Sequence, residues 1–180
     1  MRAEDLRRLE WTRGPCLPPE RAAGLWQPVL EAVDGAAGRG PVTLVVNDVA
    51  RPPLAPALGP VEHRLAGRVR LLVAVGTHRR VTAGELETLV GPVLADSECR
   101  CAGAAGYEDL GETSRGTPLE VDPWVLDSSL VVLCGSVEPH YFAGFTGGRK
   151  SLLPGCCSRR TAEANHLLAL DPAAGPGRLA

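Results

Sequence analysis

Three runs of apolar residues predict buried β-strands. They cover residues 41–46 (PVTLVV), 69–75 (VRLLVAV) and 129–137 (SLVVLCGSV), and Val and Leu dominate them. Short continuous apolar runs are typical of strands that are covered on both faces of a parallel sheet. A weaker run at 117–121 (TPLEV) predicts a further short strand, whereas the polar, glycine-rich segment 99–116 is expected to be a connecting loop.

Apolar residues at helical spacing predict three helices, which are PPERAAGLWQPVLEAV from Pro18 onward, 82–91 and 161–170. Thr82 and Glu85 form a capping-box pattern at the start of the second helix, and Thr161 lies near the cap of the third. Helices that alternate with strands indicate an α/β fold, in which a Rossmann-like parallel sheet carries flanking helices on both faces.

Polar residues follow each of the three main apolar runs directly, as N-D-V-A-R, G-T-H-R and E-P-H. Ligands of open parallel sheets bind outside the carboxyl ends of the strands. This arrangement would gather Asp48, Arg51, His78 and His140 at one edge of the sheet. Each residue alone has an ordinary explanation, such as a turn cap, a surface cation or a structural histidine. Their occurrence together favours a site.

Two histidines that face one pocket can serve as a general acid and a general base, because imidazole titrates near neutral pH. Arg51 could hold a carboxylate through two parallel hydrogen bonds, and Asp48 could orient Arg51 or one histidine. Such a pair suits racemisation or epimerisation at one carbon. It also suits dehydration and hydrolysis, so the spacing leaves these three reactions open.

The stretch AGFTGGRKS at 143–151 resembles a phosphate-binding loop, but Arg149 stands where G-x-x-x-x-G-K-[ST] requires its last glycine. Lys150 is the only lysine in the chain. Its amine can become a nucleophile, which an arginine cannot, although a single lysine can also survive by chance. His166, on the helix that follows, could bind a soft metal or simply pack there, and the residues by themselves name no metal site.

The composition narrows the function classes. With 180 residues, 44% of them apolar, and a net charge of −2, the chain fits one globular domain, and no clustered basic surface points to nucleic acid. No apolar run is long enough to cross a membrane and the N-terminus lacks a secretory signal, so we expect a cytoplasmic protein. The six cysteines occur as C-x-C, C-C and single residues, which favours reduced thiols over a zinc or redox motif.

Taken together, these motifs resemble the N-terminal domain of the nickel-dependent lactate racemase family. The matching stretches are DVARP (48–52), GTHR (76–79), GTP (116–118), PHYFAGFTGGRKSLLPG (139–155) and TAEANH (161–166). The resemblance implies an enzyme that racemises or epimerises a small 2-hydroxy acid, lactate or a relative. The reaction would use hydride transfer to and from a nickel-pincer nucleotide, a nickel pyridinium-3,5-bisthiocarboxylic acid mononucleotide, held covalently on Lys150. Separate biosynthetic proteins would supply this cofactor.

The same resemblance assigns a role to each candidate residue. It makes His78 and His140 the acid/base pair, one for each enantiomer, and His166 the nickel ligand. It places Asp48 and Arg51 at the substrate. Lys150 is the tether, and the residues expected to hold the rest of the nucleotide are Gly144, Gly147, Gly148 and Arg149.

The sequence also departs from the family pattern. Ala50 replaces a threonine, Arg80 and Val81 follow GTHR in place of Pro-Met, and CRCAGAAG replaces a loop that often contains histidine. These changes surround the pocket and leave the choice of 2-hydroxy acid open.

Family members have two domains, so residues 1–180 are expected to form one truncated N-terminal domain. The missing C-terminal domain would be supplied in cis or in trans, and an exposed apolar face is expected where it packs. Two alternatives stay open, a non-catalytic fragment that holds the cofactor or a nucleotide, and, less well supported, a P-loop phosphotransferase.

Overall fold

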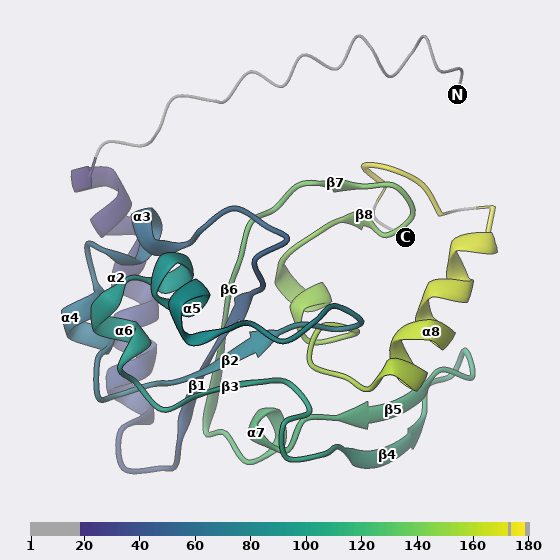
Figure 1. Cartoon of the computed structure of the whole chain (residues 1–180), viewed down its shortest axis with the longest axis horizontal. Helices are drawn as coiled ribbons and strands as arrows, with labels where there is room; N and C mark the ends of the chain where they lie inside the picture. The colour runs from purple at the N-terminus through teal and green to yellow at the C-terminus, as the bar shows by residue number, and fades with distance from the viewer. Residues whose placement is uncertain (1–18, 173, 179–180) are drawn as a thin grey trace, which may run out of the picture.

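The computed structural model describes the backbone of residues 19–172 and 174–178, with side chains from residue 24 onward (Figure 1). Pro18, where the first predicted helix begins, lies outside the described residues, as do Cys16 and the N-terminal segment. Within the described part of the chain, no helix is both long enough and apolar enough to cross a membrane.

The centre of the molecule is a parallel sheet of four strands in the order β3-β2-β1-β6. The strands are β1 (Val42–Asn47), β2 (Arg70–Ala74), β3 (Cys99–Cys101) and β6 (Leu130–Cys134). All residues of β1 are buried, as expected for a central strand with cover on both faces. The predicted parallel sheet is therefore confirmed.

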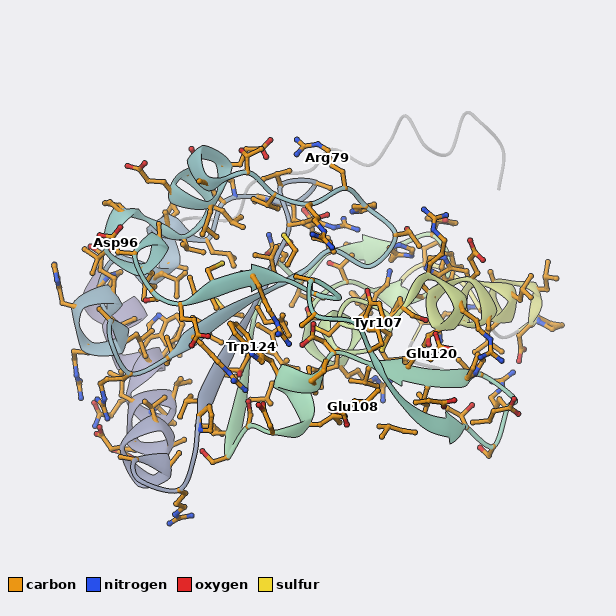
Figure 2. All side chains as sticks on the ribbon, turned by 60° about the horizontal axis from the view of Figure 1, so that its bottom comes forward. Arg79, Asp96, Tyr107, Glu108, Glu120 and Trp124 are labelled. Carbon is orange, nitrogen blue, oxygen red and sulfur yellow. The ribbon has the colours of Figure 1, made fainter. Side chains whose placement is uncertain are left out.

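Helices flank the sheet on both faces. The helices are α2 (Pro19–Ala36), α3 (Ala55–Leu58), α4 (Glu62–Leu65), α5 (Ala83–Val90), α6 (Pro92–Ala95), α7 (Pro123–Leu126) and α8 (Arg159–Leu167). Because crossovers between parallel strands are right-handed in nearly all proteins, the steps from β1 to β2 to β3 are expected to put α3 to α6 on one face, and the return from β3 to β6 to put α7 on the other. Figure 2 shows α5 and α6 on one side of the strands, with α2 and α7 on the opposite side.

Two antiparallel hairpins complete the fold. One pairs β4 (Glu108–Glu112) with β5 (Pro118–Val121), and the other pairs β7 (Pro139–His140) with β8 (Gly144–Phe145). The remaining elements are two short 3-10 helices, η1 (Gly148–Ser151) and η2 (Leu168–Leu170). The hairpin β7–β8 leads directly into η1, so it carries the glycine-rich stretch.

The predicted capping box is present at α5, where Thr82 accepts from the Glu85 N–H and Glu85 accepts from the Thr82 N–H. The prediction of a loop over 99–116 is wrong, because the segment contains β3 and β4. β3 has only three residues and every residue of β4 is exposed, so neither shows a strand-like apolar pattern. α8 begins at Arg159, before the predicted start, because the Ser158 side chain caps it.

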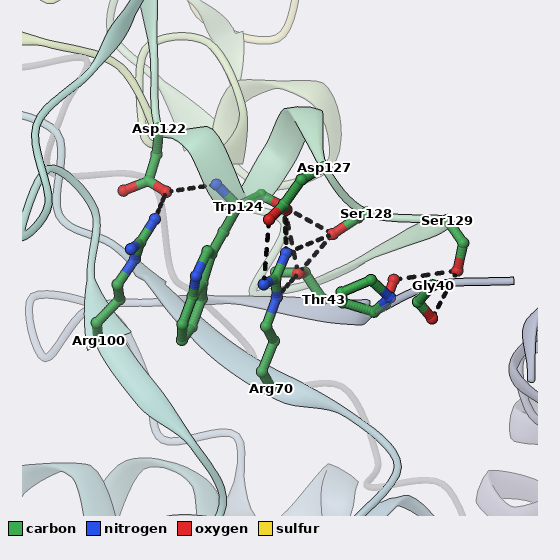
Figure 3. Close-up of polar contacts among 10 residues, drawn as sticks. Gly40, Thr43, Arg70, Arg100, Asp122, Trp124, Asp127, Ser128 and Ser129 are labelled. Atoms are coloured by element: carbon green, nitrogen blue, oxygen red, sulfur yellow. Dashed lines mark hydrogen bonds and ion pairs between the residues drawn. The ribbon is translucent and has the colours of Figure 1, made fainter. Parts of the chain in front are cut away.

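A stack of Arg70, Trp124 and Arg100 fixes α7 to the sheet (Figure 3). The two guanidinium carbons lie 4.4 and 4.1 Å from the Trp124 ring centroid. Arg70 also donates to the Trp124 carbonyl and to the Thr43 hydroxyl on β1, and Arg100 pairs with the buried Asp122. Charged groups on this face are thus paired and stacked, which offsets the cost of their burial.

Candidate functional site

A cavity of about 460 Å³ opens at the carboxyl edge of the sheet. Six of the seven candidate residues with titratable side chains line it, namely Asp48, Arg51, His78, His140, Lys150 and His166, and Arg149 does not. The first four follow β1, β2 and β6, and Lys150 and His166 come from η1 and α8. The structure therefore brings together residues separated by more than a hundred positions in the sequence.

Asp48 is buried and fixes the tautomer of His78. Its Oδ2 lies 2.5 Å from His78 Nδ1, and because an ionised carboxylate only accepts, Nδ1 must donate. The Asp48 Oδ1 also accepts from the Ala50 N–H, which holds the turn after β1. Neutral His78 therefore presents an unprotonated Nε2, which can act as a base.

His140 has the complementary tautomer. Its Nδ1 lies 3.4 Å from the Ala143 N–H and accepts from it, so the proton of the neutral ring sits on Nε2. Burial lowers the pKa of His140 to about 4, and the positive charges of Lys150 and Arg51 add to this effect. In their neutral forms, His78 thus has a free lone pair on Nε2 and His140 has a proton there.

Arg51 lies on the cavity wall and pairs with Glu138, through Nη1 and Oε2 at 3.0 Å. Its side chain is 31% exposed and that of Glu138 is 37% exposed. Glu138 follows β6, so this ion pair connects the segments that leave β1 and β6. A guanidinium has five N–H donors, so Arg51 retains donors for a carboxylate.

The glycine loop, residues 143–151, has at Gly147 a backbone conformation that only glycine tolerates well. Gly147 has φ 72°, and a Cβ there would lie 2.7 Å from the Ser136 carbonyl oxygen. The loop continues into η1, whereas a P-loop continues directly into an α-helix. This geometry does not support the P-loop alternative.

Lys150 sits on η1, where burial lowers the pKa of its amine to about 8, with a further contribution from the charge of Arg51. The Gly155 N–H donates to the Lys150 carbonyl and the Gly76 N–H to the Gly155 carbonyl, which ties this segment to the end of β2. Lys150 is therefore held in place with an amine that is more easily deprotonated than an ordinary lysine.

A second cavity of about 700 Å³ lies on the other side of the glycine loop. Gly147 and Lys150 line both cavities, whereas Gly148 and Arg149 line only the second. Gly144 lines neither, and its carbonyl instead accepts from the Gly177 N–H. The predicted nucleotide-holding residues are thus split, with Gly144 in a structural position.

Phe142 lies between the predicted cofactor and acid/base residues. Its ring centroid is 4.7 Å from that of His140 and 5.1 Å from that of His166, and Lys150 Nζ lies 5.5 Å from it. Burial and the charge of Lys150 lower the pKa of His166 and favour its neutral, metal-binding form. Among the described residues, no group of three or more His, Cys, Asp or Glu side chains could hold a metal ion.

The sequence reasoning missed several residues of the cavity, namely Asn47, Ser136, Phe142 and Thr146. Asn47 accepts from the Ser136 N–H at 3.2 Å and donates to the Asp48 carbonyl at 3.0 Å, so it connects the ends of β1 and β6. The signal was present, since Asn47 begins the polar cluster after β1 and Phe142 lies beside His140 in the motif.

Several large apolar side chains near the cavity are exposed to solvent. Val137, Tyr141, Leu167 and Leu170 are 68–82% exposed, and they lie in or next to β7, α8 and η2. β7 and α8 also carry His140 and His166. Exposed apolar side chains in segments that form a site are typical of a surface that another polypeptide covers.

Comparison with known proteins gives consistent results. Residues 29–177 match the family described as the lactate racemase N-terminal domain. The chain is 32% identical over 143 residues to the lactate racemase of Thermoanaerobacterium thermosaccharolyticum, covering 74% of this chain and 34% of that protein. It is 30% identical over 141 residues to the lactate racemase of Lactiplantibacillus plantarum, covering 73% of this chain and 33% of that protein. The chain thus spans about a third of the length of these relatives.

Solved structures support the same fold. The lactate racemase apoprotein of T. thermosaccharolyticum superposes with a TM-score of 0.73 at 28% identity, covering 89% of this chain and 42% of that one. A protein from Thermotoga maritima, at 19% identity and a TM-score of 0.72, covers 94% of this chain and 46% of that one and shares the fold. Since the family match extends over most of the sequence, the chain belongs to the lactate racemase N-terminal domain family.

Proposed function

We propose that the chain is the cofactor-binding and catalytic domain of a racemase or epimerase that acts on a small 2-hydroxy acid. The observation that carries the proposal is the convergence on one cavity of Lys150, His166, Arg51 and the pair His78 and His140. Binding a cofactor alone requires neither acid/base histidine, so their tautomers favour an enzyme over the non-catalytic alternative.

The residues fit a nickel-pincer nucleotide tethered at Lys150. An amine with a pKa of about 8 is well suited to form a covalent link, and the glycine loop offers backbone N–H groups beside it for a phosphate. His166 would contribute one imidazole, with the other nickel ligands coming from the group itself. When bound, the group supplies a reversible acceptor for the hydride of the substrate's C–H bond.

The protein's own residues would then bind the substrate and move its proton. Arg51 holds the carboxylate, and His78, with a free Nε2, takes the hydroxyl proton from one enantiomer of the substrate. His140 serves the other enantiomer in the same way, once solvent has carried its proton from Nε2 to Nδ1, which breaks the hydrogen bond from Ala143 and frees Nε2 as the base. The carboxylate of Asp48 stabilises the imidazolium that forms on His78.

We further propose that residues 1–180 form one domain and act with a second domain, in cis or in trans. The relatives are about three times as long as the matched region, and apolar side chains are exposed around the cavity. A covering domain would bury these side chains and exclude water from the cavity. Separate proteins would assemble the cofactor.

Intact mass spectrometry of the protein from its own host, with nickel measured on the same sample, tests the proposal. We expect a nucleotide-sized adduct that maps to Lys150, together with bound nickel and racemisation of lactate or a related acid. The K150R variant keeps the positive charge but should lose the adduct, the nickel and the activity. An unmodified wild-type mass without nickel contradicts the proposal and favours a degenerate binding domain.

A further inference from the structure

Glu138 pairs with Arg51, the residue proposed to bind the substrate carboxylate in the cavity. Within residues 24–172 and 174–178, it is the only residue whose side chain hydrogen-bonds the Arg51 guanidinium, and it does so through a single N–O contact of 3.0 Å. Both side chains are about one-third exposed, so a ligand in the cavity can reach the guanidinium. A substrate carboxylate can therefore bind Arg51, but only beside the negative charge of Glu138.

The backbone of Glu138 is fixed by the hairpin that carries His140. Its N–H donates to the Thr146 hydroxyl at 2.9 Å, and its carbonyl accepts from the Thr146 N–H at 2.7 Å. The Thr146 hydroxyl in turn donates to the Ser136 carbonyl at 3.0 Å, and Thr146 is buried. The backbone from which the Glu138 carboxylate extends is thus fixed, and one oxygen of this carboxylate bonds to Arg51.

The charges that line the cavity are few. Of its described lining residues, only Arg51 and Lys150 are basic apart from the imidazoles, and the one acid, Asp48, is already bonded to His78. If Lys150 becomes an amide, as the proposed function requires, it loses its charge. Arg51 then carries the remaining permanent positive charge, and Glu138 already offsets it in part. One substrate carboxylate has a partner in this arrangement, whereas a second has none.

We propose that Glu138 is a specificity-determining residue that makes the site select 2-hydroxy acids with one carboxylate over those with two. This inference rests on the proposed function and narrows its substrate class. The mechanism is repulsion, because a dicarboxylate brings a second negative charge close to Glu138, and the described lining residues offer no further permanent cation to balance it. Orientation of Arg51 by Glu138 is common to both kinds of acid and cancels in their ratio.

Calorimetric binding of lactate and malate at neutral pH to the protein that carries its cofactor on Lys150, and so lacks the lysine charge, measures this ratio directly. We expect the wild type to prefer lactate, and the E138Q variant to shift the malate-to-lactate affinity ratio roughly five- to tenfold toward malate. E138D keeps the charge but shortens the side chain, and E87Q removes one charge from the exposed surface of α5. Both controls should keep the wild-type ratio.

Two results would overturn the inference. One is an equal change for both acids in E138Q, and the other is a shift in E138D as large as in E138Q.

Propionate and succinate, which lack the hydroxyl group, separate the inference from the proposed function. If they show the Glu138-dependent preference while lactate binds no better than propionate, charge selection stands and the 2-hydroxy-acid assignment fails. If the hydroxyl strengthens binding but E138Q has no selective effect, the assignment stands and the inference fails. No binding of any acid to the wild type contradicts both.

Discussion

Two pairs of basic side chains show opposite uses of positive charge. Arg70 and Arg100 stack on Trp124, and between them they bond to Thr43, Ser128, the Trp124 carbonyl and the carboxylates of Asp122 and Asp127. We call these two arginines with Trp124 the closed cluster. Arg51 and Lys150 face the cavity, and we call them the open pair. Arg51 bonds to one carboxylate and Lys150 Nζ lies near the face of Phe142. The closed cluster buries its guanidinium groups against Trp124 to hold the fold, with the Arg100 Nε left without a partner among the described residues, whereas the open pair faces a cavity that a ligand can enter.

The titration of side chains shows the same contrast. Hydrogen bonds to Arg79 and to the Thr82 N–H lower the pKa of Glu85 to about 2, so a structural carboxylate outside the cavity stays charged. Inside the cavity, burial lowers the pKa of His140 to about 4 and that of Lys150 to about 8. These two shifts favour the neutral forms, which are the forms that donate or accept protons and act as nucleophiles.

The largest expected effect tests the closed cluster. Replacing Trp124 by Ala removes a buried aromatic ring and the surface on which both arginines stack, and we expect a loss of about 3–5 kcal/mol in the free energy of unfolding. Urea denaturation measures it. L126A in the same helix, where Leu126 is 39% exposed, is the matched control and should cost less than about 1 kcal/mol. Equal losses in the two variants would show that the stack does not stabilise the fold.

The buried central strands and the capped helix α5 were the elements that the sequence predicted best. β1, β2 and β6 follow from their apolar runs, and α5 follows from Thr82 and Glu85, because burial and capping leave local patterns. β3 and β4 could not be predicted in this way. β3 is three residues long and owes its strand to pairing with β2, and β4 is exposed and pairs only with β5. These pairings are tertiary contacts without a local signal.

For the site, the sequence identified which residues follow the strands but not how they contact one another. The topology of a parallel sheet already implied that Asp48, His78 and His140 would meet. The pairing of Arg51 with Glu138 could not be predicted, because the two lie 87 positions apart and either could have been solvated. The roles of Asn47 and Thr146 depend in the same way on backbone groups brought close by folding.

A second prediction tests whether the open pair serves binding more than stability. R51Q should weaken lactate binding by about 1.5–3 kcal/mol, the range for hydrogen bonds to charged groups, because the carboxylate loses its guanidinium partner. Its free energy of unfolding should change by less than about 1 kcal/mol, because the lost ion pair is partly exposed. Calorimetry and urea denaturation on one preparation measure both. R115Q removes a charge at an exposed ion pair with Asp171 and should affect neither. A large loss of stability in R51Q would place Arg51 with the closed cluster.

The reactivity of Lys150 gives a third prediction. Only the neutral amine reacts with an acylating reagent, so the rate at Lys150 should reach half its maximum near pH 8 in the folded chain. In urea the same lysine should return toward its ordinary pKa of 10.5. Peptide mapping separates Lys150 from the N-terminal amine, which titrates in a similar range. R51Q should raise the folded midpoint, because the Arg51 charge helps to lower this pKa.

The same shift has a consequence for stability. Between about pH 8 and 10.5 the unfolded chain binds more protons at Lys150 than the folded chain does, so this lysine's contribution to the free energy of unfolding rises with pH across that window. K150M should remove this pH dependence. A folded midpoint near the ordinary lysine value would contradict the account of a desolvated amine.

The smallest expected effect tests whether the geometry of the cavity depends on contacts at the start of α8, far from the cavity. Ser158 caps α8 by accepting from the Thr161 N–H at 3.1 Å, and its hydroxyl donates to Glu120 on β5 (Figure 2 labels Glu120). S158A should cost about 1 kcal/mol of stability, as loss of a cap does, and T82A at α5 is a matched cap removal without the Glu120 contact. If lactate affinity is unchanged in both variants, the hairpin β4–β5 stabilises α8 without setting the site. If S158A alone weakens lactate binding, the start of α8 also controls where its last turn places His166. The geometry of the cavity would then depend on β5, a strand that contributes no residue to the cavity lining.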